Sequence, residues 1–296
     1  MIGIFTMFVM IGLGVFIYLE VKDLPQLRYQ YDTICDRFYS SCRIEIEVLN
    51  QLKGPIYLFL EIDPISQTIF PIKDSFSIDQ LNGSLKIPDD NTDAEILKTD
   101  CDFALHNEDM SDVVDIESRG LNPNNVAYPC GLLPKYFPSD DFYKIEMIKD
   151  KDGELKNESY LIKSDGLITR TGDEKSPYKQ TEGQENWMDI SSDRFEIWMK
   201  RSSMYAPSKL WGKVDESLEP GTYYVHVQIS FDVSPFNGKK FFVLNGNTGH
   251  FSTKNSYIYV FPTLLLLPLG FFNILICIRM KEHSNSNKTT KEKEEG

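Results

Sequence analysis

The chain has 296 residues, of which 41% are hydrophobic and 25% are charged, and its formal net charge is −13 at pH 7. An acidic surface of this kind repels nucleic acid and anionic lipid headgroups, which argues against any function that depends on binding polyanions. The length is sufficient to bury a substantial hydrophobic core.

Two uncharged apolar stretches lie at opposite ends of the chain, at residues 1–19 and 257–278. Each has about the 20 residues that a helix needs to cross a hydrocarbon core about 30 Å thick, so we expect two transmembrane helices. The first stretch has no preceding Lys or Arg and no small-residue cleavage site, so we expect it to be retained as a membrane span instead of being removed as a signal peptide.

The segment after the second stretch, residues 279–296, contains five Lys or Arg residues, and the basic residues nearest the membrane predict a cytosolic tail. With two spans, both termini are then cytosolic. Residues 20–256 form an extracytoplasmic, lumenal domain in this topology, and the protein is an integral membrane protein.

Four of the five cysteines lie in this long loop, at Cys35, Cys42, Cys101 and Cys130. An even number of cysteines in an oxidising compartment predicts two disulfides. Three connectivities are possible, and spacing alone favours the local one, in which Cys35 pairs with Cys42 and Cys101 pairs with Cys130.

Two sequons in the loop begin at Asn82 and Asn157. Sequons of this type accept N-linked glycans only on the lumenal side of a membrane, so they agree with the predicted topology. We expect both asparagines to be glycosylated.

Along the loop the dominant hydrophobic period is two, which is typical of half-buried antiparallel strands. Apolar and polar residues alternate over residues 43–48 and again over residues 223–231, whereas residues 56–60 are apolar on both faces and predict a central strand. Asp-Gly pairs at Asp152 and Asp165 predict hairpin turns. Residues 88–125 are acidic and irregular, so the fold expected is a mainly antiparallel β-sandwich with long insertions.

No catalytic or metal-binding pattern is found in the sequence. The loop histidines, His106, His226 and His250, lie far apart and lack the spacing of metal ligands. There is no phosphate-binding glycine loop and no nucleophile elbow. The acidic pair Asp140 and Asp141 is interpreted as a solvated turn. We therefore expect a protein that is not an enzyme and that needs no cofactor or metal.

A series of short motifs occurs in a fixed order along the loop. These are GPIYLFLEI from Gly54, QLNG from Gln80, YPCGLL from Tyr128, SDDF from Ser139, IWMKRSSMYAPSKLWG from Ile197, LEPGTYYVHVQI from Leu218, FDVSPFNGKK from Phe231 and GHFSTKN from Gly249. Together with the two predicted spans, they resemble the Cdc-fifty family, also called ligand-effect modulator three. Members of that family are the non-catalytic β-subunits of type IV P-type ATPases that flip phospholipids.

The resemblance implies a partner and a location. The partner is the catalytic subunit of a type IV P-type ATPase, and membrane lipids surround the two helices. The implied role is chaperone-like: the subunit allows the ATPase to leave the endoplasmic reticulum and then supports its transport cycle in the Golgi, endosomal or plasma membrane. The resemblance also points to framework or partner-interface residues, which are Trp198, Met199, Lys200, Lys209, Leu210, Trp211 and Gly212.

The sequence departs from the family pattern in several places. Family members usually carry an NFYQNHR-like run after the first strand motif, and here the corresponding stretch keeps only Gln67 and Ser75 in register. The first cysteine cluster usually has four members, and this chain has only Cys35 and Cys42. Contacts made by these elements are therefore expected to differ. A different class of function, a two-span adhesion or receptor-like protein with a β-rich ectodomain, remains an alternative.

Overall fold

The computed structural model describes residues 26–35, 41–84, 97–171, 175–179 and 186–246, together with residues 12, 270 and 274–281. The chain divides into two compact units, one of which is Pro25–Asn247 and the other Met1–Leu24 with Thr248–Gly296. The predicted spans and the tail lie almost entirely outside the described residues. Among the residues that are described, no helix has the length and apolar character needed to cross a bilayer.

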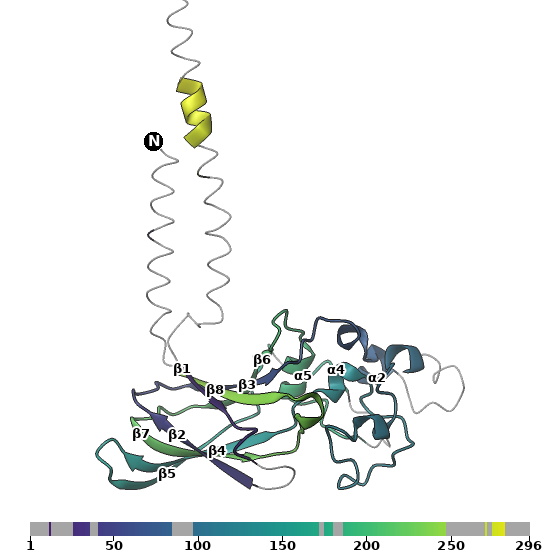
Figure 1. Ribbon diagram of the computed structural model, residues 1–296, viewed down its shortest axis with the longest axis horizontal. Helices are drawn as coiled ribbons and strands as arrows, with labels where there is room; N and C mark the ends of the chain where they lie inside the picture. The colour runs from purple at the N-terminus through teal and green to yellow at the C-terminus, as the bar shows by residue number, and fades with distance from the viewer. Residues whose placement is uncertain are drawn as a thin grey trace, which may run out of the picture. The chain divides into compact units, whose positions relative to one another are not determined.

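The unit Pro25–Asn247 contains two four-stranded antiparallel sheets that face each other (Figure 1). The first sheet has the order β1-β8-β3-β6, and its strands are β1 (Gln26–Gln30), β8 (Lys239–Asn245), β3 (Ile56–Asp63) and β6 (Ser208–Val214). The second has the order β2-β7-β4-β5, and its strands are β2 (Ser41–Val48), β7 (Gly221–Gln228), β4 (Asp141–Asp150) and β5 (Leu155–Leu161). The mainly β, antiparallel fold expected from the sequence is therefore confirmed.

The strands follow the hydrophobic pattern of the sequence. In β2 the side chains of Ile44, Ile46 and Val48 are buried, and those of Arg43 and Glu45 between them are exposed. Strand β3 lies between β8 and β6 and is buried or half-buried along its whole length, as its continuous apolar run predicts. These apolar faces form one core between the two sheets.

Aromatic rings join the two sheets at the centre of this core. Phe142 of β4 lies 5.5 Å from Phe242 of β8, measured between ring centroids. Tyr31, directly after β1, contacts Phe142 edge-on at 5.3 Å. Contacts of this geometry add about 0.5 to 1.5 kcal/mol each to the burial of the rings.

The strands are interrupted by two long insertions that form a lobe at one end of the sandwich (Figure 1). Residues 64–140 separate β3 from β4, and residues 162–207 separate β5 from β6. The described residues of the lobe include five short helices whose bounds are defined at both ends. They are η1 (Ile72–Asp74), α2 (Ile78–Leu81), η2 (Asn107–Met110), α4 (Leu132–Lys135) and α5 (Asp193–Met199), and a further short helix, η3 (Ser234–Phe236), precedes β8.

Three local expectations can be compared with this structure. Asp152 and Gly153 form the turn between β4 and β5, as predicted, and Gly153 has the positive φ of 83° that favours glycine. Asp165 and Gly166 do not close a hairpin, because β5 ends at Leu161 and the next strand is β6, far along the chain. The strand predicted over residues 223–231 ends at Gln228, where the backbone turns towards Asp140.

Candidate functional site

Three tryptophans, two in the lobe and one in β6, hold one segment of the lobe in place. Trp187, Trp198 and Trp211 are each 1% exposed, and each indole Nε1–H donates a hydrogen bond to a backbone carbonyl within residues 129–140. The acceptors are the carbonyls of Pro129 at 2.8 Å, Leu133 at 2.7 Å and Asp140 at 2.8 Å, in the same order. Because buried carbonyls without partners are costly, these bonds fix the path of the segment as well as its packing.

Gln80 of the QLNG motif makes the next set of links to the same segment. Its side-chain amide donates to the carbonyl of Ala127 at 2.9 Å and accepts from the backbone N–H of Cys130 at 2.8 Å. The hydroxyl of Tyr128 donates back to the carbonyl of Gln80 at 2.7 Å. All four residues are buried, so the QLNG and YPCGLL motifs form one hydrogen-bonded unit.

The two residues that remain of the NFYQNHR-like run are buried cross-links. Gln67 donates to the carbonyl of Trp198 at 2.9 Å and accepts from the backbone N–H of Ser202 at 3.0 Å. The Ser75 hydroxyl donates to the carbonyl of Asp102 at 2.9 Å and accepts from the backbone N–H of Leu132 at 2.9 Å. These contacts give a physical reason for keeping Gln67 and Ser75 where the rest of the run differs.

Gly131 lies beside Ser75 and has a φ of 102°. A Cβ atom built on Gly131 would overlap the backbone carbonyl of Ser75, so the position requires glycine for both conformation and space. The neighbouring disulfide, Cys101–Cys130, ties the irregular excursion to the same place.

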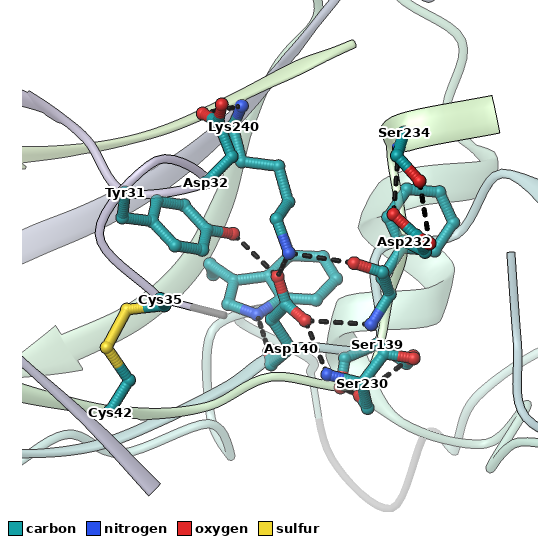
Figure 2. Close-up of polar contacts among 12 residues, drawn as sticks. Tyr31, Asp32, Cys35, Cys42, Ser139, Asp140, Ser230, Asp232, Ser234 and Lys240 are labelled. Carbon is teal, nitrogen blue, oxygen red and sulfur yellow. Dashed lines mark hydrogen bonds and ion pairs between the residues drawn. A yellow bond between two sulfur atoms is a disulfide. The ribbon is translucent and has the colours of Figure 1, made fainter. Parts of the chain in front are cut away.

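A buried polar network centred on Asp140 joins the two sheets (Figure 2). Asp140 is 0% exposed, and its carboxylate accepts hydrogen bonds from the Tyr31 hydroxyl at 2.7 Å and from Lys240 Nζ at 2.7 Å. It also accepts from the backbone N–H groups of Ser230 at 2.7 Å and Phe231 at 2.9 Å. Lys240 Nζ donates in addition to the carbonyl of Phe231 at 2.8 Å.

The Asp140 network brings together segments that lie far apart in the sequence. Burial, followed by the negative charge of Asp140, raises the pKa of Tyr31 well above its usual value, so the hydroxyl stays protonated and remains a donor. The backbone N–H of Lys240 donates to Asp32 at 2.8 Å. The network therefore connects the end of β1, the start of β4, the end of β7 and the start of β8. The solvated turn expected for Asp140 is wrong, whereas its neighbour Asp141 is exposed.

Both disulfides of the loop have the local pairing that the spacing favours. Cys35 is joined to Cys42, close to the Asp140 network (Figure 2), and Cys101 is joined to Cys130. By loop-closure entropy the longer bridge contributes roughly 3 to 4 kcal/mol and the shorter about 2.5 kcal/mol. The longer bridge stabilises the excursion, whose described residues form no named strand.

The residues expected at a partner interface are mostly inside the domain. Trp198, Met199, Lys209, Trp211 and Gly212 are buried, and Lys200 is exposed. A Cβ atom on Gly212 would overlap the side chain of Ile162, so this glycine is required by close packing. We therefore interpret the buried members as framework, and a direct contact with a partner is left to the exposed part of the segment.

Lys209 is an unusual member of this framework because its ammonium group is buried against carbonyl groups. Its Nζ donates to the carbonyls of Ile197, at 3.2 Å, and of Lys200, at the C-terminal end of α5, and it lies 5.9 Å from the centre of the Trp198 ring. Burial lowers the pKa of Lys209 to about 8.

This burial predicts a pH dependence of stability. The pKa of Lys209 is lower in the folded protein than the value of about 10.4 for an unfolded chain. Protonation of the buried amine below about pH 8 therefore lowers the free energy of unfolding. That penalty disappears as the pH rises towards 10. Between about pH 8 and pH 10 we expect the free energy of unfolding of the wild-type protein to rise relative to that of Lys209→Met. Denaturant unfolding at several pH values measures this difference. Lys200→Met, a change at an exposed neighbour, controls for the lost charge, and a difference that did not change with pH would contradict the prediction.

The side chains in the part of the chain that the structure describes can also be compared with the requirements of a metal site. No group of three or more His, Cys, Asp or Glu side chains gathers there in a way that could hold a metal ion. The buried polar side chains described above form hydrogen bonds with one another and with backbone groups.

Comparison with known proteins gives the same family as the motifs. The family model described as the LEM3 (ligand-effect modulator 3) family / CDC50 family matches residues 28–283. The chain belongs to the CDC50 family. The match covers all but the first three residues of the folded unit and continues through the second apolar stretch.

One curated relative is the "Phospholipid-transporting ATPase accessory subunit CRF1" of Saccharomyces cerevisiae. It is 24% identical over 230 residues, which cover 70% of this chain and 51% of the relative. The chain thus spans about half the length of the curated relative that it matches. A solved structure, "Crystal Structure of GEBA250068378 from Sulfurospirillum deleyianum", aligns with 75% of this chain and 98% of that protein, at 12% identity and a TM-score of 0.29.

The motifs that indicated the CDC50 family are also the places where the lobe is cross-linked internally and joined to the sandwich. Gln80, Cys130, Asp140, Trp198 and Lys240 each belong to one of these motifs and each is buried in a contact described above. Sequence reasoning missed the pairing of Asp140 with Lys240. The available signal was a pair of like charges in each of two motifs that occur together, Asp140-Asp141 in SDDF and Lys239-Lys240 in FNGKK.

Proposed function

We propose that this protein is a non-catalytic accessory subunit of a phospholipid-transporting P-type ATPase. The observation that carries this proposal is the CDC50-family match, which extends over residues 28–283 and includes the folded unit and the second predicted span. The name of the yeast relative, an accessory subunit of such an ATPase, supports the same conclusion.

The geometry of the folded unit is suited to this role. Two disulfides and the indole hydrogen bonds of Trp187 and Trp198 stabilise the sandwich and the lobe internally. The indole hydrogen bond of Trp211 and the Asp140 network join the lobe to the sandwich. A body of this kind can cover and hold a partner with little loss of conformational entropy on binding.

The finer features of the proposal follow from the sequence. The apolar stretches 1–19 and 257–278 are two membrane spans, both termini are cytosolic, and the folded unit is lumenal. The partner is the catalytic subunit of a type IV P-type ATPase. The subunit supports folding of that ATPase, its exit from the endoplasmic reticulum and its transport cycle. Within residues 198–212 the exposed side chains are the ones available for contact with the partner, and they are Lys200, Arg201, Ser203, Met204 and Tyr205.

Purification from detergent-solubilised membranes tests the proposal directly. A tagged full-length chain should recover a P-type ATPase in stoichiometric amount, and depletion of the chain should leave that ATPase in the endoplasmic reticulum with loss of lipid asymmetry. An adhesion or receptor-like protein would recover no such ATPase. The proposal fails if the ATPase reaches its destination and works without this chain, or if the purified chain alone moves labelled phospholipid when ATP is added.

A further inference from the structure

Strand β5 forms an open edge of its sheet. It pairs with β4 on one side, and no strand among the described residues pairs with its other side. All of its residues except Tyr160 are exposed. An open edge presents unpaired backbone N–H and C=O groups, which can pair with a strand of another molecule.

The solvent face of this edge is apolar at both ends. Leu155 is 78% exposed and Leu161 is 67% exposed. Leu161 lies opposite Lys144 and alternates with Tyr160, whose ring packs near Tyr223 of the core, so Leu161 points away from the core. Burial of exposed apolar side chains makes strand pairing between molecules more favourable, so leucines on an open edge increase the risk of self-association.

The middle of β5 contains features that oppose strand pairing. Met147 pairs with Glu158 and Lys149 pairs with Leu155, so two residues of β5, Lys156 and Asn157, lie opposite a single residue of β4. This is the arrangement of a β-bulge, which bends a strand and interrupts its pairing. Lys156 and Glu158 add charges on either side of Asn157, another common protection of edges.

Asn157 is the acceptor of the Asn157-Glu158-Ser159 sequon, and both Asn157 and Ser159 are exposed. We propose that an N-linked glycan on Asn157 shields the open edge of β5 and its two exposed leucines from strand pairing between molecules. The site combines an accessible acceptor, an interrupted strand and apolar neighbours within one short edge. The inference rests on the lumenal location of the folded unit in the proposed function.

The modification step needs a lipid-linked oligosaccharide pyrophosphate as co-reactant. The side-chain amide nitrogen of Asn157 forms a bond to the anomeric carbon of the first sugar and loses a proton. The bond between that carbon and the pyrophosphate oxygen breaks, and the lipid pyrophosphate leaves. The hydroxyl of Ser159 completes the sequon that the transferase recognises.

The other sequon provides a matched control. Asn82 follows α2 in the lobe, and its side-chain oxygen accepts a hydrogen bond from the backbone N–H of Ser84 at 2.9 Å. It lies outside the strands of both sheets. A glycan on Asn82 would therefore add bulk and solubility without covering a sheet edge.

The experiment uses the full-length glycoprotein in detergent and compares Asn157→Gln with Asn82→Gln. Loss of the Asn157 glycan should shift the protein in size-exclusion chromatography from its monomeric position to dimers and larger species as concentration rises. Asn82→Gln should keep the wild-type elution. Enzymatic removal of the glycans from folded wild-type protein should reproduce the shift, which separates shielding from any effect on folding.

A rescue variant tests the role of the leucines. Adding Leu155→Glu and Leu161→Glu to Asn157→Gln should restore the monomeric elution, because each new carboxylate faces a lysine of β4, Lys149 or Lys144. The inference is overturned if Asn157 carries no glycan while Asn82 does, if Asn157→Gln stays monomeric, or if the glutamates fail to restore the monomer. If neither asparagine is modified, both the inference and the lumenal location of the folded unit are contradicted. Recovery of the ATPase is a separate test of the proposed function.

Discussion

Replacing Asp140 by asparagine should lower the free energy of unfolding by about 3 to 5 kcal/mol, because it leaves a buried ammonium group without its countercharge. Lys240 Nζ lies 2.7 Å from the Asp140 carboxylate, and both side chains are almost fully buried. The change also weakens the acceptor for Tyr31 and for two backbone N–H groups. Denaturant unfolding of the full-length protein in detergent, followed by fluorescence of the three buried tryptophans, measures the loss.

The adjacent residue gives a matched control for this change. Asp141 makes an ion pair with Arg194 at 2.8 Å, but its side chain is about half exposed. Pairs of this kind contribute at most about 1 kcal/mol, so Asp141→Asn should have a small effect. The double variant Asp140→Leu with Lys240→Met removes both charges and should recover part of the loss. Equal effects of Asp140→Asn and Asp141→Asn would contradict the central role of the network.

Local patterns were sufficient to predict much of the sandwich. The alternation over residues 43–48 is a property of the strand itself, since side chains two residues apart share a face. The Asp152-Gly153 turn likewise depends only on the backbone preferences of those two residues. The local disulfide pairing agrees with the low entropic cost of closing short loops.

The burial of Asp140 could not be predicted in this way. An acidic residue is usually exposed, and it can be buried only where a cation and hydrogen-bond donors meet it. Its cation, Lys240, is 100 positions away in the sequence, and Tyr31 is 109 positions away. Only the three-dimensional arrangement of β1, β4 and β8 brings these groups together, so the adjacent pair Asp140 and Asp141 gave a misleading local signal.

The aromatic and basic residues between Trp198 and Gly212 were ambiguous for a related reason. Tryptophan next to lysine and arginine is typical of binding hot spots, but it is also typical of a core whose indole N–H needs an acceptor. The deciding fact is the position of the 129–140 segment, whose carbonyls accept from Trp198 and Trp211. That segment is distant in sequence, and its path follows from Gly131 and the Cys101–Cys130 bridge.

Truncation of Trp211 should have an effect as large as the loss of Asp140. The indole is fully buried, contacts the ring of Phe137 at 5.2 Å and donates to the carbonyl of Asp140. Trp211→Ala should therefore cost about 3 to 5 kcal/mol from the cavity alone. Trp211→Phe keeps most of the packing and loses the hydrogen bond, so it should cost less, about 1 to 3 kcal/mol.

This series also separates framework from interface in the proposed ATPase complex. If Trp211 acts as framework, recovery of the ATPase should fall in proportion to the loss of folded protein, and Trp211→Phe should lie between the wild type and Trp211→Ala in both measurements. Tyr205→Ala, at an exposed position, should leave the unfolding transition unchanged, because its side chain is 66% exposed. A Trp211→Ala protein that unfolded like the wild type and yet recovered no ATPase would place this residue at the interface, because its loss would then act on binding alone.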